Sequence, residues 1–299
     1  MNSIKRLYDL ITDSFVNFRR DQGIRMAAAI AFLSILSAIP IMVLTLMIGS
    51  TMLDTEDIER DIVPWVQQRI GEDSAESVQQ LFDRASEADV FSLMALLNMA
   101  LLLYSGSTVF YELHKSMNNV WGIEQDPDEK SLWVTIEKRA ISVFAVVVFG
   151  ALILVMLATT GLLLAIRANI ESTGGRYAIT FVNIVLPMII AFFIAVLVYK
   201  YVPDIEIGWH VVIPPAIFVA IAYVIGLGIF QFYLANSLSG SIYENFGIVM
   251  VALLWLFYSA VTLFFGAEIT QVYAKDINAK VEVKQSANIL DEARLPMSS

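Results

Sequence analysis

Six stretches of the chain contain no Asp, Glu, Lys or Arg, and each is at least 22 residues long. They cover residues 26–53, 90–111, 140–166, 177–199, 207–243 and 245–267. A helix rises about 1.5 Å per residue and the hydrocarbon layer is roughly 30 Å thick, so about 20 apolar residues can cross it. Every stretch reaches that length. The pattern predicts an all-α polytopic membrane protein with six transmembrane helices.

The composition excludes several classes of protein. Hydrophobic residues make up 58% of the chain and charged residues only 16%, which is not the balance of a soluble domain. The chain has no cysteine, and its two histidines, His114 and His210, cannot form a three-histidine zinc site. A net charge of -10 opposes binding to nucleic acid. No catalytic motif is recognisable, so we expect no enzyme activity, no catalytic residues, no metal site, no cofactor and no nucleic-acid partner.

The basic residues outside the apolar stretches predict the orientation. When alternate segments are counted together, 14 of the 19 Lys and Arg residues fall on the side that holds both termini, and five fall on the other side. The positive-inside rule then places both termini in the cytoplasm. The chain is expected to form one membrane domain over 1–299, with cytoplasmic segments at 1–25, 112–139 and 268–299 and an outer loop at 54–89.

The outer loop at 54–89 is acidic, with 11 Asp and Glu residues and three arginines. Apolar residues nevertheless recur at helical spacing on both sides of Gly71, which predicts an amphipathic helical hairpin. Two interpretations of this hairpin stay open. It could be a lid or a surface that binds an envelope protein, or it could simply pack on the bilayer surface.

Prolines and small residues mark the first predicted span. Pro40 there, and Pro187 in the fourth span, each remove a backbone donor and are expected to kink their helices. In the first span Ala27, Ala31 and Ser34 follow one another at helical spacing. This face should lie inside the bundle, with Ser34 and Ser37 able to form hydrogen bonds. Whether it lines a polar pathway or only a helix contact is left open.

The second predicted span continues into a polar helical segment. Its polar stripe consists of Tyr104, Ser107, Tyr111, His114 and Asn118, and its apolar stripe consists of Phe110, Leu113, Met117, Val120 and Trp121. The helix is therefore expected to extend beyond the membrane. Glu112, His114 and Lys115 should lie at the inner boundary of the bilayer, where they could carry protons or bind an anionic lipid headgroup. The alternative is an interfacial helix with a Glu112–Lys115 pair.

Glu268 closes the last apolar stretch and is expected near the same inner boundary. Ionisable groups at membrane depth are costly, which makes them candidates for function. We predict that Glu268 is a partner for His114 and Lys115. The candidate polar pathway or headgroup site therefore consists of Ser34, Ser37, Ser107, Glu112, His114, Lys115 and Glu268.

Three blocks of the sequence resemble the YihY/BrkB family of bacterial inner-membrane proteins. They are AAAIAFLSILSAIP at 27–40, SGSTVFYELHKSMNNVWG at 105–122 and FGIVMVALLWLFYSAVTLFFGAEI at 246–269. The resemblance implies an inner-membrane protein with six helices, cytoplasmic termini and a periplasmic outer loop. Members have carried the labels virulence factor, serum-resistance factor and ribonuclease BN. The acidic composition conflicts with the nuclease label, and the family implies no catalytic residues.

These observations favour a protein for transport or lipid handling in the cell envelope. The alternative is a non-transporting scaffold or assembly factor, in which the outer loop at 54–89 and the C-terminal tail bind envelope proteins. Membrane lipids are the expected partners in either case. The sequence makes no prediction about the oligomeric state, the substrate or the coupling ion.

Overall fold

The computed structural model describes residues 3–52, 64, 93–125, 173–237, 244–284 and 287–289. Helices dominate these residues, joined by a few short strands. The helices are α1 (Ser3–Arg20), α2 (Gly23–Met52), α6 (Leu93–Trp121), α8 (Thr173–Tyr201), α9 (Trp209–Ser237) and α10 (Glu244–Asp276). The strands are β1 (Ile123–Gln125), β2 (Ile205–Glu206), β3 (Glu282–Val283) and β4 (Ala287–Ile289). The predicted all-α class is confirmed.

The chain divides into two compact units. Unit 1 consists of Met1–Phe32 and Val109–Ser299, and unit 2 consists of Leu33–Thr108. Helices α2 and α6 each contribute to both units. Unit 1 therefore contains α1, the first turns of α2, the last turns of α6, and all of α8, α9 and α10.

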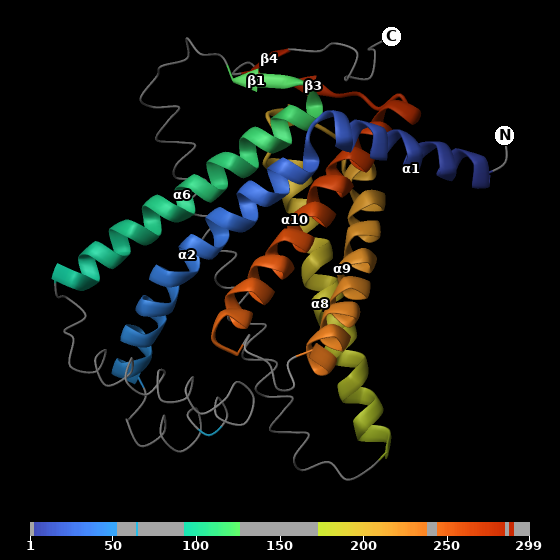
Figure 1. The fold of residues 1–299 in the computed structure, drawn as a ribbon. Helices are drawn as coiled ribbons and strands as arrows, with labels where there is room; N and C mark the ends of the chain where they lie inside the picture. The colour runs from blue at the N-terminus through green and yellow to red at the C-terminus, as the bar shows by residue number, and fades with distance from the viewer. Residues whose placement is uncertain are drawn as a thin grey trace. The chain divides into compact units, whose positions relative to one another are not determined.

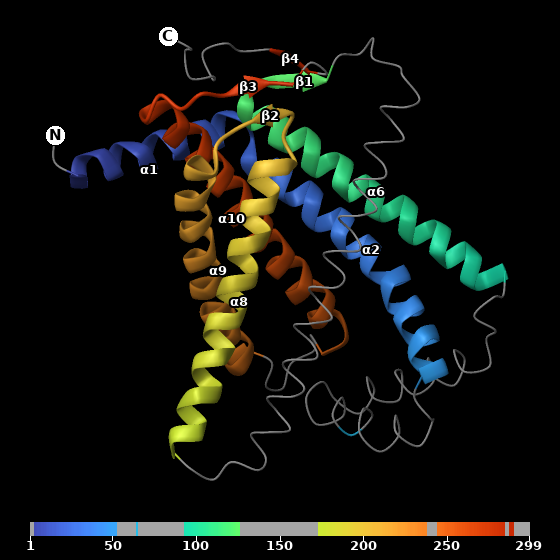
Figure 2. The same cartoon turned by 180° about the vertical axis from the view of Figure 1, so that it is seen from behind.

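Within unit 1, α8, α9 and α10 lie side by side, and α1 lies across one end of them (Figure 1). The view from behind shows the same arrangement, with the short strands at that same end (Figure 2). β1 pairs antiparallel with β4, and β2 pairs antiparallel with β3. The tail that follows α10 thus folds back onto two loops of its own unit.

Three of the described helices are long and apolar enough to cross a membrane. Their candidate spans are Ile184–Tyr201 in α8, Trp209–Tyr233 in α9 and Met250–Asp276 in α10. A shorter apolar segment, Gly23–Ser37, lies in α2. These four agree with the first, fourth, fifth and sixth predicted spans. The third predicted span and, apart from residue 64, the predicted hairpin at 54–89 lie outside the described residues.

Helix α9 shows the surface that lipid requires. Ile213, Ile217, Ile221, Ile225 and Ile229 follow one another every four residues, and all five are exposed. Exposing such a stripe of large apolar side chains to water is unfavourable, whereas contact with lipid tails is favourable. Helical periodicity and exposure together therefore identify this stripe as a face toward the bilayer.

The prolines of the spans do not end their helices. Helices α2 and α8 remain helical through Pro40 and Pro187, so whether these prolines kink the helices stays a prediction. Pro214 and Pro215 lie in the second turn of α9, near its start as expected. Close to a helix start a proline removes fewer hydrogen bonds than it would in the interior.

Two tyrosines form hydrogen bonds between α10 and its neighbouring helices, and glycine makes room for the close contact. Tyr199 of α8 donates its hydroxyl to the Leu263 carbonyl at 2.7 Å, and Tyr258 of α10 donates to the Ala222 carbonyl of α9 at 2.6 Å. A Cβ on Gly266 would lie 2.2 Å from a Val219 methyl carbon and 2.3 Å from the Tyr199 hydroxyl. Glycine thus permits the close helix approach, as small residues do in membrane helix packing.

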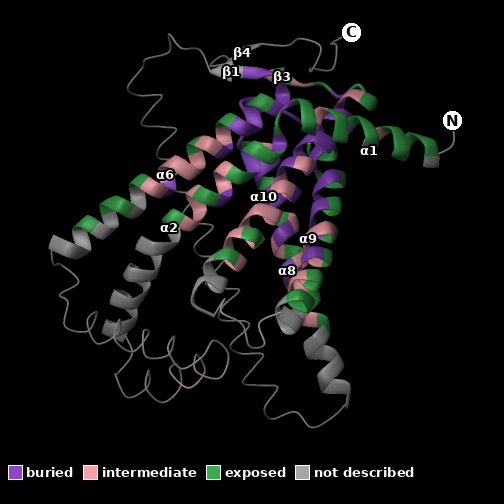
Figure 3. Ribbon diagram, viewed as in Figure 1, coloured by how far each residue is buried: buried purple, intermediate pink, exposed green. Residues whose placement is uncertain are grey.

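The core of unit 1 lies at the end where α1 crosses α10. Figure 3 shows buried residues gathered at this end of α8, α9 and α10. The cluster includes the whole predicted apolar stripe of α6 except Phe110, which packs against it, and it adds Phe18, Tyr199 and Phe264 from other helices. The apolar stripe of α6 thus packs into the core of unit 1. The same end of the unit also holds buried polar groups, which form the candidate site.

Candidate functional site

The centre of the site is the loop at 202–208, which joins α8 to α9. Pro203 cannot continue the helix, and α8 ends two residues before it. The loop turns inward, because Val202, Asp204 and Ile205 are all buried. A buried loop needs partners for its backbone and side-chain polar groups. The rest of unit 1 supplies them.

Helix α6 supplies the first partners through one acidic residue, Asp204. Asn118 donates its amide to Oδ2 of Asp204 at 2.9 Å, and its amide oxygen accepts the Asp204 backbone N–H at 2.8 Å. One turn earlier on α6, His114 Nε2 lies 3.1 Å from the same Oδ2. Two side chains of one helix therefore hold one carboxylate. Asn118 is only 3% exposed and Asp204 only 5% exposed, which makes these bonds costly to lose.

The tail and α8 supply further partners for the same loop. Lys284 donates its backbone N–H to the Asp204 carbonyl at 3.0 Å and its side chain to the Pro203 carbonyl at 3.3 Å. Lys200 of α8 donates to the Ile207 carbonyl. The β2–β3 pair adds Ile205 opposite Val283. Three separate segments thus fix the backbone of one loop.

The residue after Asn118 joins a second turn to α6. Asn119 donates to the carbonyl of Asp21 at 3.3 Å, in the turn between α1 and α2. This turn is tight because Gln22 has a φ of 58°, in the left-handed region. Helix α6 then ends at Trp121, and the next residue, Gly122, has a φ of 67°, which suits glycine just after a helix. The consecutive asparagines therefore hold two different loops against the end of α6.

Helix α10 contributes a second set of buried polar residues. Glu268 and Gln271 are fully buried, and Thr270 is 1% exposed. Gln271 accepts a hydrogen bond from Asn17 of α1 at 3.3 Å, and the Thr270 hydroxyl donates to the Gly266 carbonyl of its own helix. The sequence predicts a cytoplasmic segment at 268–299. Helix α10 continues through the start of this segment to Asp276, and Glu268, Thr270 and Gln271 are buried within it.

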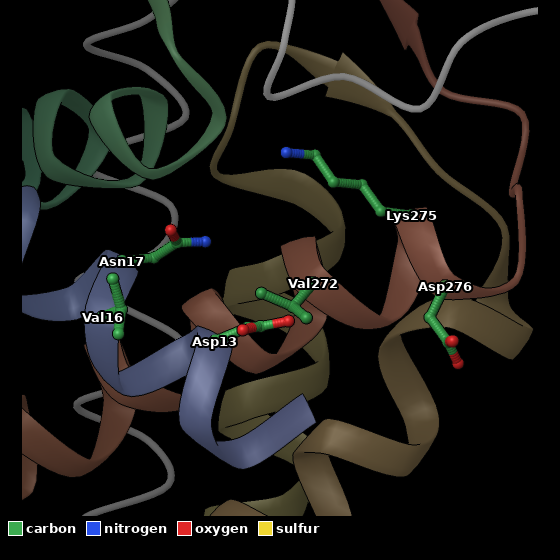
Figure 4. Close-up of a pocket in the computed structure, with 6 residues that line it drawn as sticks. All are labelled: Asp13, Val16, Asn17, Val272, Lys275 and Asp276. Carbon is green, nitrogen blue, oxygen red and sulfur yellow. The ribbon is translucent and has the colours of Figure 1, made fainter. Parts of the chain in front are cut away.

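A groove opens between α1 and the end of α10. It has a volume of about 450 Å³ and is lined by Asp13, Val16, Asn17, Val272, Lys275 and Asp276. Figure 4 shows these side chains on the two facing helices. The Arg6 guanidinium donates to the Asp276 carboxylate at 2.6 Å.

Further along the tail, Lys280 forms an exposed ion pair with Glu282. The hydrogen bond to Glu282 and the negative charge of Glu282 raise the pKa of Lys280.

The predicted site residues are distributed over both units. Glu112, His114, Lys115 and Glu268 belong to unit 1, and Ser34, Ser37 and Ser107 belong to unit 2. On α6, Lys115 is exposed and Glu112 is only partly buried, whereas His114 lies against Asp204. On α2, Ser37 donates to the carbonyl of Leu33 in its own helix at 3.0 Å. The predicted partnership of Glu268 with His114 and Lys115 stays a prediction.

The chemistry available at this end of unit 1 is binding and proton or charge movement. His114, Asp204 and Glu268 supply an imidazole and two buried carboxylates, groups that can take up and release protons. Among the described residues, no group of three or more His, Cys, Asp or Glu side chains could hold a metal ion. Sequence reasoning missed Asp204, because one aspartate in a loop after a proline carries no signal of burial.

Comparison with known proteins identifies the family. A model of the family described as "Virulence factor BrkB" matches residues 14–289 of this chain. The chain belongs to this family. The resemblance of the three sequence blocks to the YihY/BrkB family is therefore confirmed.

Curated relatives of this BrkB-family chain are membrane proteins by name. The "UPF0761 membrane protein" of Chromohalobacter salexigens is 23% identical over 262 residues, which cover 84% of this chain and 60% of that protein. The protein of that name from Alkalilimnicola ehrlichii is 22% identical, over 86% of this chain and 56% of its own length. The one from Pseudoalteromonas atlantica is 23% identical, over 93% and 90%.

The chain thus spans little more than half the length of the first two relatives. No solved structure matches it significantly. Family, relatives and apolar helices together establish that this BrkB-family chain is a membrane protein. Two of the three blocks that carry the resemblance also supply the site, since His114 and Asn118 lie in the second and Glu268 in the third.

Proposed function

We propose that this protein transports a solute or handles lipid in the bacterial cell envelope, and that Glu268 carries the charge or proton involved. The observation that supports this most is the complete burial of the Glu268 carboxylate within a candidate membrane span. Removing a carboxylate from water costs several kcal/mol, at least until it is paired or protonated. Ionisable residues are rare in membrane spans and usually belong to ion or substrate pathways.

Further polar groups at the same end of unit 1 support the proposal. His114 and Asp204 add a second ionisable pair, and Gln271 and Asn17 add buried amides that can hydrogen-bond. We propose that these groups form the cytoplasmic end of a polar pathway, in agreement with the excess of basic residues on the side of both termini. The protein would reside in the inner membrane and act without catalysis, with membrane lipids as its immediate partners.

The first experiment compares two variants of α10. Glu268→Gln keeps the shape of the side chain and removes its charge, and the matched control Thr270→Val removes a neighbouring buried hydroxyl that only bonds its own helix. A strain lacking the protein would be complemented with each variant, and its envelope lipids and metabolites would be profiled. We expect Thr270→Val to restore the parental profile and Glu268→Gln not to restore it, at equal membrane levels. Full restoration by Glu268→Gln would contradict the proposal.

A second experiment tests for a water-filled pathway. The native chain has no cysteine, so single cysteines can be placed at Ser34, Ser107 and Gly247 without changing any other residue. We expect a membrane-impermeant maleimide to label at least one of them in intact vesicles, and Glu268→Gln to change the labelling rate. Complete protection of all three sites would argue against a polar pathway.

The scaffold alternative receives less support. It assigns partner binding to the outer loop at 54–89 and to the tail, but tail residues 282–283 and 287–289 pair with β2 and β1 of the same chain. One edge of each of these tail strands is thereby occupied, which favours the outer loop as the surface for a partner. Crosslinking from Trp65 and Phe82 would test this, and capture of an envelope protein by both positions would favour the scaffold.

A further inference from the structure

Helix α1 exposes an apolar stripe outside the core of unit 1. Leu7, Ile11 and Phe15 follow one another every four residues, and they are 59%, 39% and 53% exposed. With about 3.6 residues per turn, these positions share one face of the helix. The same face continues one turn further to Phe18, which is buried against the core, and Ser14 at the edge of this face is buried as well. Among the residues that the structure describes, Leu7, Ile11 and Phe15 thus leave a large part of their apolar surface uncovered.

The charges of α1 are arranged around this stripe. Arg19 borders it beside Phe15, Lys5 lies further round on the same side, and Asp9 and Asp13 lie on the opposite side of the helix. Counting Arg6 and Arg20 as well, α1 holds four basic and two acidic residues. With six charges in 18 residues, α1 is too polar to cross a membrane. An apolar face with basic residues at its border is typical of helices that lie in the membrane surface.

Contacts with α10 show which side of α1 faces the membrane interior. Asn17 contacts Gln271, whereas the next residue, Phe18, packs edge-to-face on Phe265 with ring centroids 5.8 Å apart. Phe265 lies six residues before Gln271, about 9 Å deeper along the span. The apolar stripe borders Phe18, so it faces the depth of Phe265. Asp13 faces the groove at Lys275 and Asp276, near the end of the span.

Independent markers place α1 at the level of the membrane surface. Arg6 pairs with Asp276, the last residue of the candidate span in α10. At the same end of unit 1, Lys200 lies over the ring of Trp209 at 5.7 Å, and Tyr201 packs against the same ring. Trp, Tyr and Lys gather where a span leaves the hydrocarbon layer. Helix α1 crosses the bundle at this boundary (Figure 1).

We propose that α1 is a membrane-surface anchor whose apolar stripe inserts into the leaflet at this end of the bundle, where the lipid surface is anionic. Leu7, Ile11 and Phe15 enter the boundary between headgroups and acyl chains. Lys5 and Arg19 bind lipid phosphates at its rim, and Asp9 and Asp13 stay in water. The proposal does not depend on the proposed transport function, because none of the residues that enter the leaflet or bind its phosphates is assigned to the polar pathway.

Spin labels on the full-length protein test the proposal. Single cysteines at Leu7, Ile11 and Phe15, and control cysteines at Asp9 and Thr12, would be labelled in nanodiscs of phosphatidylethanolamine and phosphatidylglycerol. The stripe positions are exposed, so a label there disturbs no internal packing. Oxygen concentrates among acyl chains, and a water-soluble nickel chelate stays outside. We expect the ratio of oxygen to nickel collisions to be higher at all three stripe positions than at both controls.

Two results would overturn the anchor. Nickel access at the stripe equal to that at the controls would place α1 in water. Protection of the stripe from both reagents, with spin–spin broadening between labels, would show that a second copy of the chain covers it.

A further experiment with charge variants separates the electrostatic attraction to lipid from the burial of the apolar stripe. The double variant Lys5→Gln, Arg19→Gln should lower the collision ratio at Ile11 in anionic nanodiscs and leave it unchanged in phosphatidylcholine, whereas an equal drop in both lipids would contradict the role of anionic headgroups.

Discussion

Single buried polar residues hold whole loops in place in this protein. Asn118 uses both ends of its side-chain amide on Asp204, and His114 reaches the same carboxylate oxygen. An aspartate with 5% exposure cannot turn to water if these partners are lost. The cost of an unsatisfied buried group is then greater than the net gain of the bond that satisfied it.

We expect Asn118→Ala to lower the free energy of unfolding by about 1–3 kcal/mol, because it leaves the Asp204 N–H and carboxylate short of partners. Thermal unfolding of the purified protein in detergent would measure this as a drop in Tm. Tyr111→Ala, at an exposed position on the same helix, is the control and should shift stability by no more than about 0.5 kcal/mol. Equal effects of the two variants would show that the Asn118–Asp204 bonds contribute no stability.

Pairs of helices in unit 1 depend on close approach at glycines. Gly266 of α10 faces Val219 of α9 and Tyr199 of α8. The absence of a side chain at Gly266 therefore leaves room for residues of two neighbouring helices. In a membrane the hydrophobic effect does not drive helices together, and tight packing and hydrogen bonds do most of this work. The tyrosine bonds to Leu263 and Ala222 supply such hydrogen bonds directly.

Gly266→Ala should destabilise the protein by about 1–3 kcal/mol through overpacking, because a branched Val219 methyl carbon stands 2.2 Å from the new Cβ. The matched control is Gly228→Ala on α9, where a Cβ would meet nothing within 4 Å. This control should be neutral or should stabilise by up to about 1 kcal/mol, because alanine favours helix over glycine. Chemical denaturation in mixed micelles would compare the two variants. A neutral Gly266→Ala would contradict the close packing.

For the protein as a whole, the C-terminal tail ties segments together that are far apart in sequence. β3 and Lys284 hold the loop at 202–208, and β4 pairs with β1 after the end of α6. Neither strand pair has a hydrophobic face large enough to be stable alone. They persist because helices on both sides already bring their ends together.

Truncation after Asn278 should expose the loop at 202–208 without unfolding the spans. Hydrogen–deuterium exchange in nanodiscs would show faster exchange at Ile205 and Glu206, and unchanged protection in the middle of α9. Truncation after Ile289 keeps both strand pairs and is the control. The role assigned to the tail would be refuted by equal exchange of the loop in the two truncated proteins.

Four of the apolar spans, the helical extension of α6 and its apolar stripe could be predicted from sequence, because hydrophobicity and helical periodicity are local properties of a chain. The partner of His114 could not, because Asp204 meets α6 across 86 residues and has no local pattern that sets it apart. The same holds for the contact of Asn17 with Gln271, which are 254 residues apart. A charge also marks a membrane boundary only where it meets solvent. The sequence shows that residue 268 is a glutamate, which marks the end of the last charge-free stretch. Its burial cannot be seen in the sequence, because it depends on the helices packed around it.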